Sequence, residues 1–130
     1  MYFDKKSSPV ASINCGKVSI NSEADNVHIE KVLNCVDADK IATKKFKVAI
    51  DSVNGAGARV AKSLLAKLGC EVAAINDDMS GIFAHTPEPT EANLGQLCEH
   101  VKETGAMVGF AQDPDADRLA IVFTSESPFW

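Results

Sequence analysis

Apolar residues recur with a helical period near the start of the chain and with strand-like runs further on. Between about Val27 and Ile41 the apolar spacing is helical, and it breaks near Asp37. This pattern predicts a helix and a short second helical turn, both packed on a sheet. Residues 1–26 are polar, rich in serine and without a clear period, so we expect a lead-in rather than a folded unit.

Two strand-and-helix units are predicted next. Residues 48–51 form a short apolar run typical of a strand, and residues 60–68 carry an apolar stripe at helical spacing that Gly69 ends. A second strand is expected from Glu71 to Ile75. Asn76 to Pro89 then reads as a long loop, and loops of this length are uncommon unless they are functional.

The last part of the chain predicts one more helix and two strands. Thr90 is placed to cap a helix that ends at Gly105. Two apolar runs, Met107–Ala111 and Leu119–Phe123, predict strands joined by a short loop, which favours an antiparallel pair. The earlier strand-and-helix units imply a parallel core with helices on both faces, so the expected fold is α/β with a mixed sheet.

The loop between these last two strands carries the strongest chemical signal. It reads Gln-Asp-Pro-Asp-Ala-Asp-Arg over residues 112–118 and is called the aspartate loop below. Three carboxylates at alternate positions repel one another, and a divalent cation held by oxygen ligands relieves that repulsion. Arg118 adds a forked cation suited to a phosphate oxygen. The loop therefore predicts a magnesium site used in phosphoryl transfer.

Three other interpretations of the aspartate loop stay open at this point. An EF-hand loop begins with the same aspartate spacing but needs glycine and glutamate where Arg118 and Thr124 stand. A phosphoaspartate hydrolase would also place its first aspartate at a strand end, as Asp113 is. A solvated turn would use the aspartates only for local hydrogen bonds, although it gains nothing from a third carboxylate.

Composition narrows the range of functions. The chain has 130 residues and a formal net charge of −5, without a basic stripe, so we expect no nucleic-acid partner. No apolar run approaches a membrane span, and the first residues lack the apolar core of a signal peptide. We therefore expect a soluble, cytoplasmic chain with no membrane partner. The cysteines are expected to be reduced core residues; they are Cys15, Cys35, Cys70 and Cys98.

Asp-Pro-Asp-Ala-Asp-Arg-Leu after an apolar strand resembles the metal-binding loop of the α-D-phosphohexomutases, the phosphoglucomutase and phosphomannomutase family. Further blocks resemble the second domain of that family in the same order; they are Phe46–Gly57, His85–Pro89 and Glu91–Leu94. Together the matching blocks cover the chain from about Phe46 to Phe123. The resemblance implies a three-layer α/β/α sandwich, with a mixed four-stranded sheet whose last strand is antiparallel.

The resemblance also implies a reaction. Family members move a phosphoryl group between O1 and O6 of a hexose phosphate through a phosphoserine, with Mg²⁺ as cofactor. By that pattern Asp113, Asp115 and Asp117 are the metal ligands, and Arg118 contacts the phosphoserine or the transferring phosphate. The implied partners are a hexose phosphate substrate and the other domains of the same polypeptide.

Several family motifs are missing from this sequence. The phosphoserine loop, the sugar-reading loop and the terminal phosphate loop are absent, and Ser7-Ser8-Pro9 is no substitute for the first. We expect residues 27–124 to form the second domain, with residues 1–26 as a lead-in and 125–130 as the start of a linker. Such a fragment should have no mutase activity alone. The alternative is a stand-alone α/β module that binds a divalent metal or a phosphorylated ligand.

Two further segments were weighed for a role in the site. Asn54–Gly57 could cradle a phosphate at a helix start, but a structural turn is favoured because the segment lacks the lysine of a P-loop. His85 and Glu88 could reach the cleft through their loop. They are not predicted to be catalytic, and neighbouring prolines are expected to stiffen that loop.

Overall fold

The computed structural model describes residues 16–123. Cys15, Ser7-Ser8-Pro9 and the expected 125–130 linker lie outside the described residues. The helices are α1 (Ala24–Leu33), α2 (Ala38–Thr43), α3 (Ala58–Lys67) and α4 (Gly95–Thr104), with a 3₁₀ turn η2 (Glu91–Asn93) before α4. The strands are β1 (Lys47–Asp51), β2 (Glu71–Ile75), β3 (Val108–Gln112) and β4 (Leu119–Phe123).

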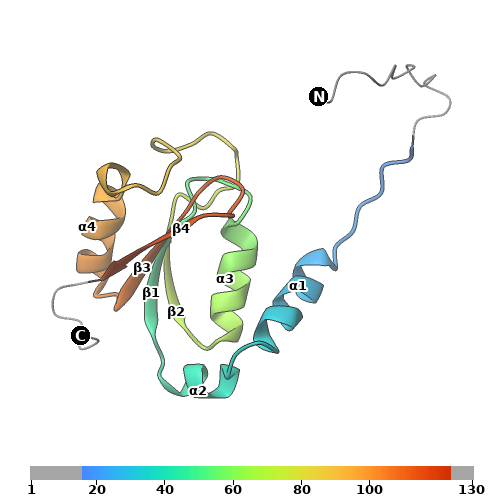
Figure 1. The fold of residues 1–130 in the computed structure, drawn as a ribbon, viewed down its shortest axis with the longest axis horizontal. Coiled ribbons are helices and arrows are strands. Elements are labelled where there is room, and N and C mark those ends of the chain that lie inside the picture. Colours follow the sequence, from blue (N-terminus) through green and yellow to red (C-terminus); the bar gives the residue numbers. More distant parts are fainter. Residues whose placement is uncertain (1–15, 124–130) are drawn as a thin grey trace, which may run out of the picture.

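The four strands form one mixed sheet in the order β2-β1-β3-β4. Strand β1 is parallel to both neighbours, so that Ile50 is paired with Ala74 on one side and Phe110 on the other. Strand β4 is antiparallel to β3. Helices α3 and α4 lie on opposite faces of the sheet (Figure 1). The predicted α/β/α sandwich with a reversed last strand is confirmed.

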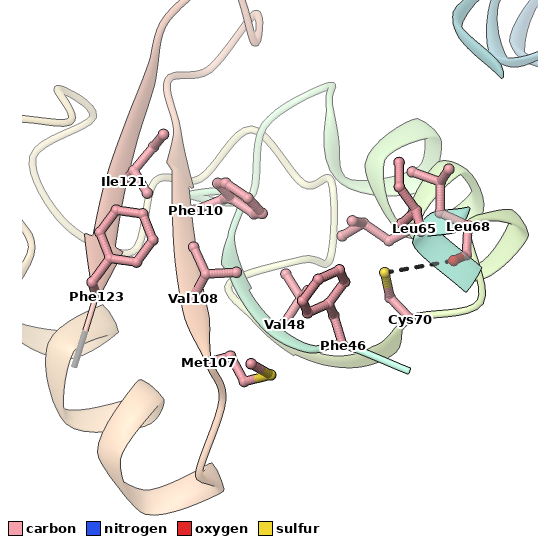
Figure 2. A pocket seen from close by; sticks show the side chains of 11 residues that line it. Phe46, Val48, Leu65, Leu68, Cys70, Met107, Val108, Phe110, Ile121 and Phe123 are labelled. Carbon is pink, nitrogen blue, oxygen red and sulfur yellow. Dashed lines mark hydrogen bonds between the residues drawn. The ribbon is translucent and has the colours of Figure 1, made fainter. Parts of the chain in front are cut away.

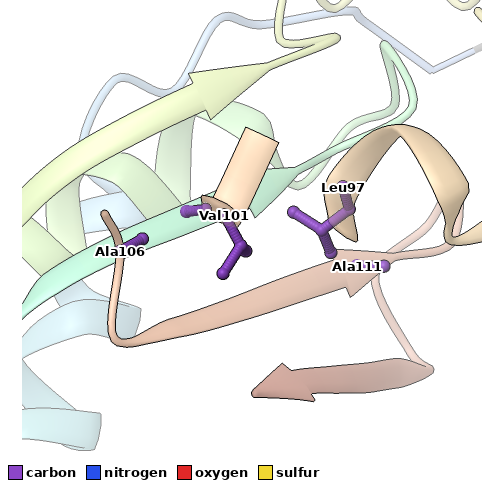
Figure 3. Close-up of a cluster of buried hydrophobic side chains, with 5 residues drawn as sticks. Leu97, Val101, Ala106 and Ala111 are labelled. Atoms are coloured by element: carbon purple, nitrogen blue, oxygen red, sulfur yellow. The ribbon is translucent and has the colours of Figure 1, made fainter. Parts of the chain in front are cut away.

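Helix α4 covers the face formed by β1, β3 and β4. Its Leu97 and Val101 are buried and pack with Ala111 of β3 and with Ala106, which precedes that strand (Figure 3). Their approach is close enough that a Cβ at Gly109 would lie 2.6 Å from a methyl group of Val101. The small residues on this face of β3 therefore set the distance at which α4 packs.

The opposite face is covered by α3, which packs against β2. Helix α1 packs against α3 and not against the sheet, so our expectation for this helix is wrong. Ile29 is its single buried side chain, and Arg59 of α3 reaches Asp25 of α1 with a nitrogen–oxygen distance of 2.6 Å. One buried apolar side chain supports packing on a neighbouring helix, whereas a helix on a sheet needs a wider apolar stripe.

The part of this second face that belongs to β3 and β4 carries no helix among the described residues. It forms an apolar groove of about 510 Å³ lined by α2, α3, β1, β3 and β4. In Figure 2, Phe110, Ile121 and Phe123 rise from β3 and β4 on one side, and Leu65 lies on α3 across from them. Ile121 is 52% exposed and Phe123 is 46% exposed. All five residues of β4 are apolar, a pattern typical of strands that are covered on both faces.

The start of the last helix differs from the prediction. Thr90 makes no side-chain cap, and α4 begins at Gly95 after the 3₁₀ turn. The Thr90 hydroxyl instead accepts a hydrogen bond from Nδ2 of Asn93 at 3.1 Å. Its competing side-chain partner explains why the cap prediction is wrong. Within residues 16–123, no helix has the length and apolar character that crossing a bilayer requires.

Candidate functional site

The carboxyl ends of the parallel strands β1 and β3 meet at one edge of the sheet, where ligands bind in open α/β folds. Asp51 ends β1, and Asp113 follows β3 directly. Both carboxylates are buried. The two strand ends are tied together by the Ser52 hydroxyl, which donates to Oε1 of Gln112 at 3.1 Å. Two buried acidic residues thus mark this edge as the candidate site.

The aspartate loop brings its three carboxylates together. Oxygen atoms of Asp113, Asp115 and Asp117 all lie within 4.8 Å of one another. Asp113 is buried at the base, while Asp115 and Asp117 are exposed at the rim. Mg²⁺ binds oxygen ligands such as carboxylates, and oxygens bound to one Mg²⁺ lie at most about 4.2 Å apart. Small side-chain movements would therefore suffice for the residues to hold this cation.

Arg118 donates two hydrogen bonds to the buried carboxylate of Asp113. Its backbone N–H donates to Oδ1 of Asp113 at 3.2 Å, and its Nε donates to Oδ2 at 2.8 Å. Burial acts to raise the pKa of Asp113, but the hydrogen bonds and charge of Arg118 outweigh it and lower the pKa to about 2. Asp113 is therefore an anion at neutral pH with both oxygens already oriented.

Asp117 has the opposite character. Its hydrogen bond with Asp113 and the negative charges of Asp115 and Asp113 raise the pKa of Asp117, which the charge of Arg118 only partly offsets. The rim of the loop thus carries negative charge that a single arginine leaves incompletely neutralised. A cation placed among the three carboxylates would relieve this repulsion, so the donor set and the charge both fit a divalent metal.

The turn after β1 supports the aspartate loop from below. The backbone N–H of Ala56 donates to the Pro114 carbonyl at 2.8 Å, and that of Gly55 donates to the Ser52 carbonyl at 2.7 Å. A Cβ at Gly57 would lie 2.7 Å from the Cβ of Ala116. Because the amides of Gly55 and Ala56 are engaged within the fold, the structure favours the predicted structural turn for Asn54–Gly57.

A second contact at this edge was not foreseen from the sequence. His85 reaches across from its loop, and its Nε2 lies 2.8 Å from Oδ2 of Asp51. The other oxygen of Asp51 accepts hydrogen bonds from the Val53 N–H and from Nδ2 of Asn76. A buried acidic residue that ends an apolar strand was the signal for this cluster. The histidine partner is 34 residues away and could not be inferred from spacing.

The described cysteines agree with the sequence prediction only in part, because Cys35 is exposed and is not the core residue we expected, while Cys70 and Cys98 are half-buried. Cys35, Cys70 and Cys98 are free thiols. Cys70 lines the apolar groove, and burial raises the pKa of its thiol. A thiol with a raised pKa is a poor nucleophile at neutral pH, so we do not expect Cys70 to act as one.

Comparisons with known proteins agree with the fold. Residues 26–126 match the family model described as phosphoglucomutase/phosphomannomutase, alpha/beta/alpha domain II. A phosphoglucomutase/phosphomannomutase of Thermococcus kodakarensis is 43% identical over 96 residues, which are 73% of this chain and 21% of that protein. A probable phosphoglucosamine mutase of Methanococcoides burtonii is 40% identical over 115 residues, which are 88% of this chain and 25% of that protein.

Solved structures show the same likeness. A phosphoglucomutase/phosphomannomutase family protein of Burkholderia thailandensis superposes with a TM-score of 0.65 at 30% identity, over 76% of this chain and 21% of that one. A putative phosphomannomutase of Thermus thermophilus gives a TM-score of 0.67 at 26% identity, over 76% of this chain and 24% of that one. The chain therefore spans a fifth to a quarter of these relatives, and it belongs to the phosphoglucomutase/phosphomannomutase family, whose α/β/α domain II it matches.

Proposed function

We propose that this chain serves as the magnesium-binding second domain of a phosphohexomutase. In that enzyme a phosphoryl group moves between O1 and O6 of a hexose phosphate by way of a phosphoserine, which another domain supplies. The observation that carries the proposal is the group of three carboxylates within 4.8 Å of one another beside Arg118, in a member of this family.

Each residue of the aspartate loop has a role in this proposal. Asp113, Asp115 and Asp117 hold the Mg²⁺, which when bound neutralises charge on a transferring phosphoryl group. Arg118 uses its backbone N–H and Nε to orient Asp113, while 57% of its side chain is exposed. The exposed terminal nitrogens are then available to a phosphate oxygen.

The proposal also includes other domains of the same polypeptide as partners. The apolar groove of β3 and β4 supports this part, because its lining lacks the polar groups that fix a small ligand. In this view residues 27–124 are the domain, residues 1–26 and 125–130 are connections, and the chain without its neighbours does not turn over substrate. Free thiols at the described cysteines agree with a cytoplasmic location.

Metal binding is tested by a manganese titration of the ¹⁵N-labelled chain, with paramagnetic broadening of backbone amides as the readout. Broadening should centre on residues 113–118 and disappear in Asp115→Asn. Asp39→Asn is the matched control, because Asp39 is an equally exposed carboxylate on α2, away from the loop. Broadening that persists in Asp115→Asn would contradict the metal role.

Catalysis is tested in the full-length protein with glucose 1-phosphate, mannose 1-phosphate and glucosamine 1-phosphate as substrates. Turnover of at least one sugar by the parent, with loss in Asp115→Asn and retention in Asp39→Asn, supports the mutase proposal. Localised metal binding without turnover of any of the three would favour the metal-binding module instead. Turnover by the 130-residue chain alone would contradict the proposed division of labour between domains.

A further inference from the structure

His85 has both ring nitrogens beside acceptor atoms. Nδ1 lies 2.9 Å from the Thr86 carbonyl oxygen, and Nε2 lies 2.8 Å from Oδ2 of Asp51. A backbone carbonyl oxygen cannot donate a hydrogen bond. Oδ1 of Asp51 accepts from the Val53 N–H at 2.9 Å and from Asn76 at 3.1 Å, so the other oxygen, Oδ2, is the one that faces the ring.

With Asp51 as a carboxylate, only one protonation state of the ring satisfies this arrangement. A neutral imidazole carries one N–H and one lone pair, so either tautomer would point a lone pair at an acceptor oxygen. The imidazolium donates from both nitrogens. It also pairs its charge with Asp51, whose side chain is only 4% exposed and would otherwise be a poorly compensated buried anion.

The bridge fastens the middle of a loop whose start is held separately. There, Asn76 donates to Asp51 and Asp77 forms an ion pair with Lys62 of α3. Between these points and His85 the loop is tied by neutral hydrogen bonds. The Asn54 side chain donates to the Ile82 carbonyl at 2.9 Å, and the Gly81 N–H donates to the Asn54 carbonyl at 2.9 Å.

The pKa of Arg118 is raised mainly by its hydrogen bond to Asp113 and the charge of Asp113, and the charge of Glu88 on the same loop adds to this. The position of the loop therefore contributes to the charge around Arg118.

We propose that His85 is a positioning residue: as an imidazolium between Asp51 and the Thr86 carbonyl, it holds the Asn76–Pro89 loop against the carboxyl end of β1, and its deprotonation loosens that loop. The inference goes beyond the proposed function, because it concerns the metal-free fold and holds whatever the site binds. It makes the loop beside the aspartate site respond to pH without altering any metal-binding carboxylate.

The charges around the ring agree with this role. Burial acts to lower the pKa of His85, but the hydrogen bonds to Asp51 and Thr86 and the charge of Asp51 together raise it. Among the described residues, Asp51 of β1 is the charged side chain that acts on the ring, and the loop itself presents the neutral Thr86 carbonyl. The histidine and its counter-ion therefore form an isolated pair.

The test is a pH titration of the full 130-residue chain in metal-free buffer, with ¹⁵N-labelled histidine side chains observed by NMR. We expect both ring nitrogens of His85 to be protonated at pH 6.5 and to titrate above that value, with the exposed His28 as a reference in the same spectrum. Amide exchange at Gly81 reports on the loop. Its protection factor should fall with rising pH, by about tenfold for each unit by which the measured pKa exceeds 6.5.

Three variants distinguish a pH-dependent positioning role of His85 from a purely structural one. His85→Gln keeps one donor toward Asp51 but cannot titrate, so Gly81 protection should no longer depend on pH. Asp51→Asn should lower the pKa of His85, while His28→Gln should behave like the parent chain. A His85 ring that is a neutral single tautomer at pH 6.5 would overturn the proposal, as would Gly81 protection that falls equally with pH in His85→Gln. If Asp51→Asn fails to fold, the pH dependence of Gly81 protection in His85→Gln still tests the proposal.

Discussion

Gly55 lies directly beneath Pro114, so close that a Cβ at position 55 would be 2.6 Å from the Pro114 carbonyl oxygen and 2.8 Å from its Cα. Both of these atoms belong to the backbone, which has little freedom to yield. The turn after β1 and the aspartate loop therefore touch backbone to backbone. Any side chain at position 55 would push the aspartate loop away from the sheet edge.

Gly55→Ala should destabilise the chain by about 1–3 kcal/mol, the usual range for overpacking a closely packed position. The variant should also weaken the hydrogen bond from the Ala56 N–H to the Pro114 carbonyl. Urea denaturation measures the first effect and amide exchange at Ala56 the second. Gly95→Ala is the matched control, because nothing lies within 4 Å of a Cβ there; equal effects of the two substitutions would contradict the steric argument.

Ala116→Gly should stabilise the chain by about 0.5–1 kcal/mol. Ala116 has φ of 61°, a left-handed conformation that costs an L-residue about 1–2 kcal/mol. Glycine removes this cost, and the extra conformational entropy that glycine loses on folding costs less, about 0.5–1 kcal/mol. Thermal and urea unfolding check the prediction. Ala66→Gly, at an exposed position of helix α3, should instead cost about 0.5–1 kcal/mol. Destabilisation by both changes would argue against strain at Ala116.

Stability should fall as pH rises through the pKa of His85. The folded chain holds this proton more tightly than the unfolded chain, since the pKa of His85 is raised above 6.5. The stabilisation is therefore fully present below 6.5 and is lost above the raised value. Urea denaturation from about pH 6 to about pH 9 should show the parent losing stability relative to His85→Gln. A constant difference between the two chains over this range would be the contrary result.

Neighbouring residues on β4 should differ in how much stability is lost when each is replaced by threonine, because they face opposite sides of the sheet. Ile121 is 52% exposed in the apolar groove, whereas Val122 packs against the α4 core. Ile121→Thr should change stability by no more than about 0.5 kcal/mol and should reduce self-association in sedimentation experiments. Val122→Thr should cost about 1–3 kcal/mol, because it places a hydroxyl against apolar side chains. Similar stability losses in both variants would show that the groove face is already covered.

The sheet was predictable because its signals are local. A short loop between two apolar runs is compatible only with antiparallel strands, and helices between the earlier strands require parallel crossovers. Glycines at the ends of helices α3 and α4 have φ of 73° at Gly69 and 68° at Gly105, as their positions predicted. The grouping of the three aspartates also follows from their spacing within one loop.

The failures of prediction have a common physical origin in contacts between distant parts of the chain. Helical spacing shows that α1 has an apolar side but not which surface that side meets. Threonine is a common N-cap residue, yet the Thr90 hydroxyl accepts a hydrogen bond from the Asn93 side chain instead of capping the helix. The pairing of His85 with Asp51 depends on the path of a long loop, for which no periodic signal exists. Tertiary packing decided each of these outcomes.

The order of strands in the sheet also affects how fast the chain can fold. Strand β1 lies next to β3, and the side chains of Ser52 and Gln112, which join the two strand ends, are 60 residues apart in the chain. Closing so long a loop costs entropy before any contact compensates for it, and such pairings slow folding. Asp113 reaches its place only when β3 docks beside β1. We therefore expect the three aspartates to stay near one another in their loop throughout folding, whereas the turn after β1 and the buried Asp51 join them only when the sheet closes.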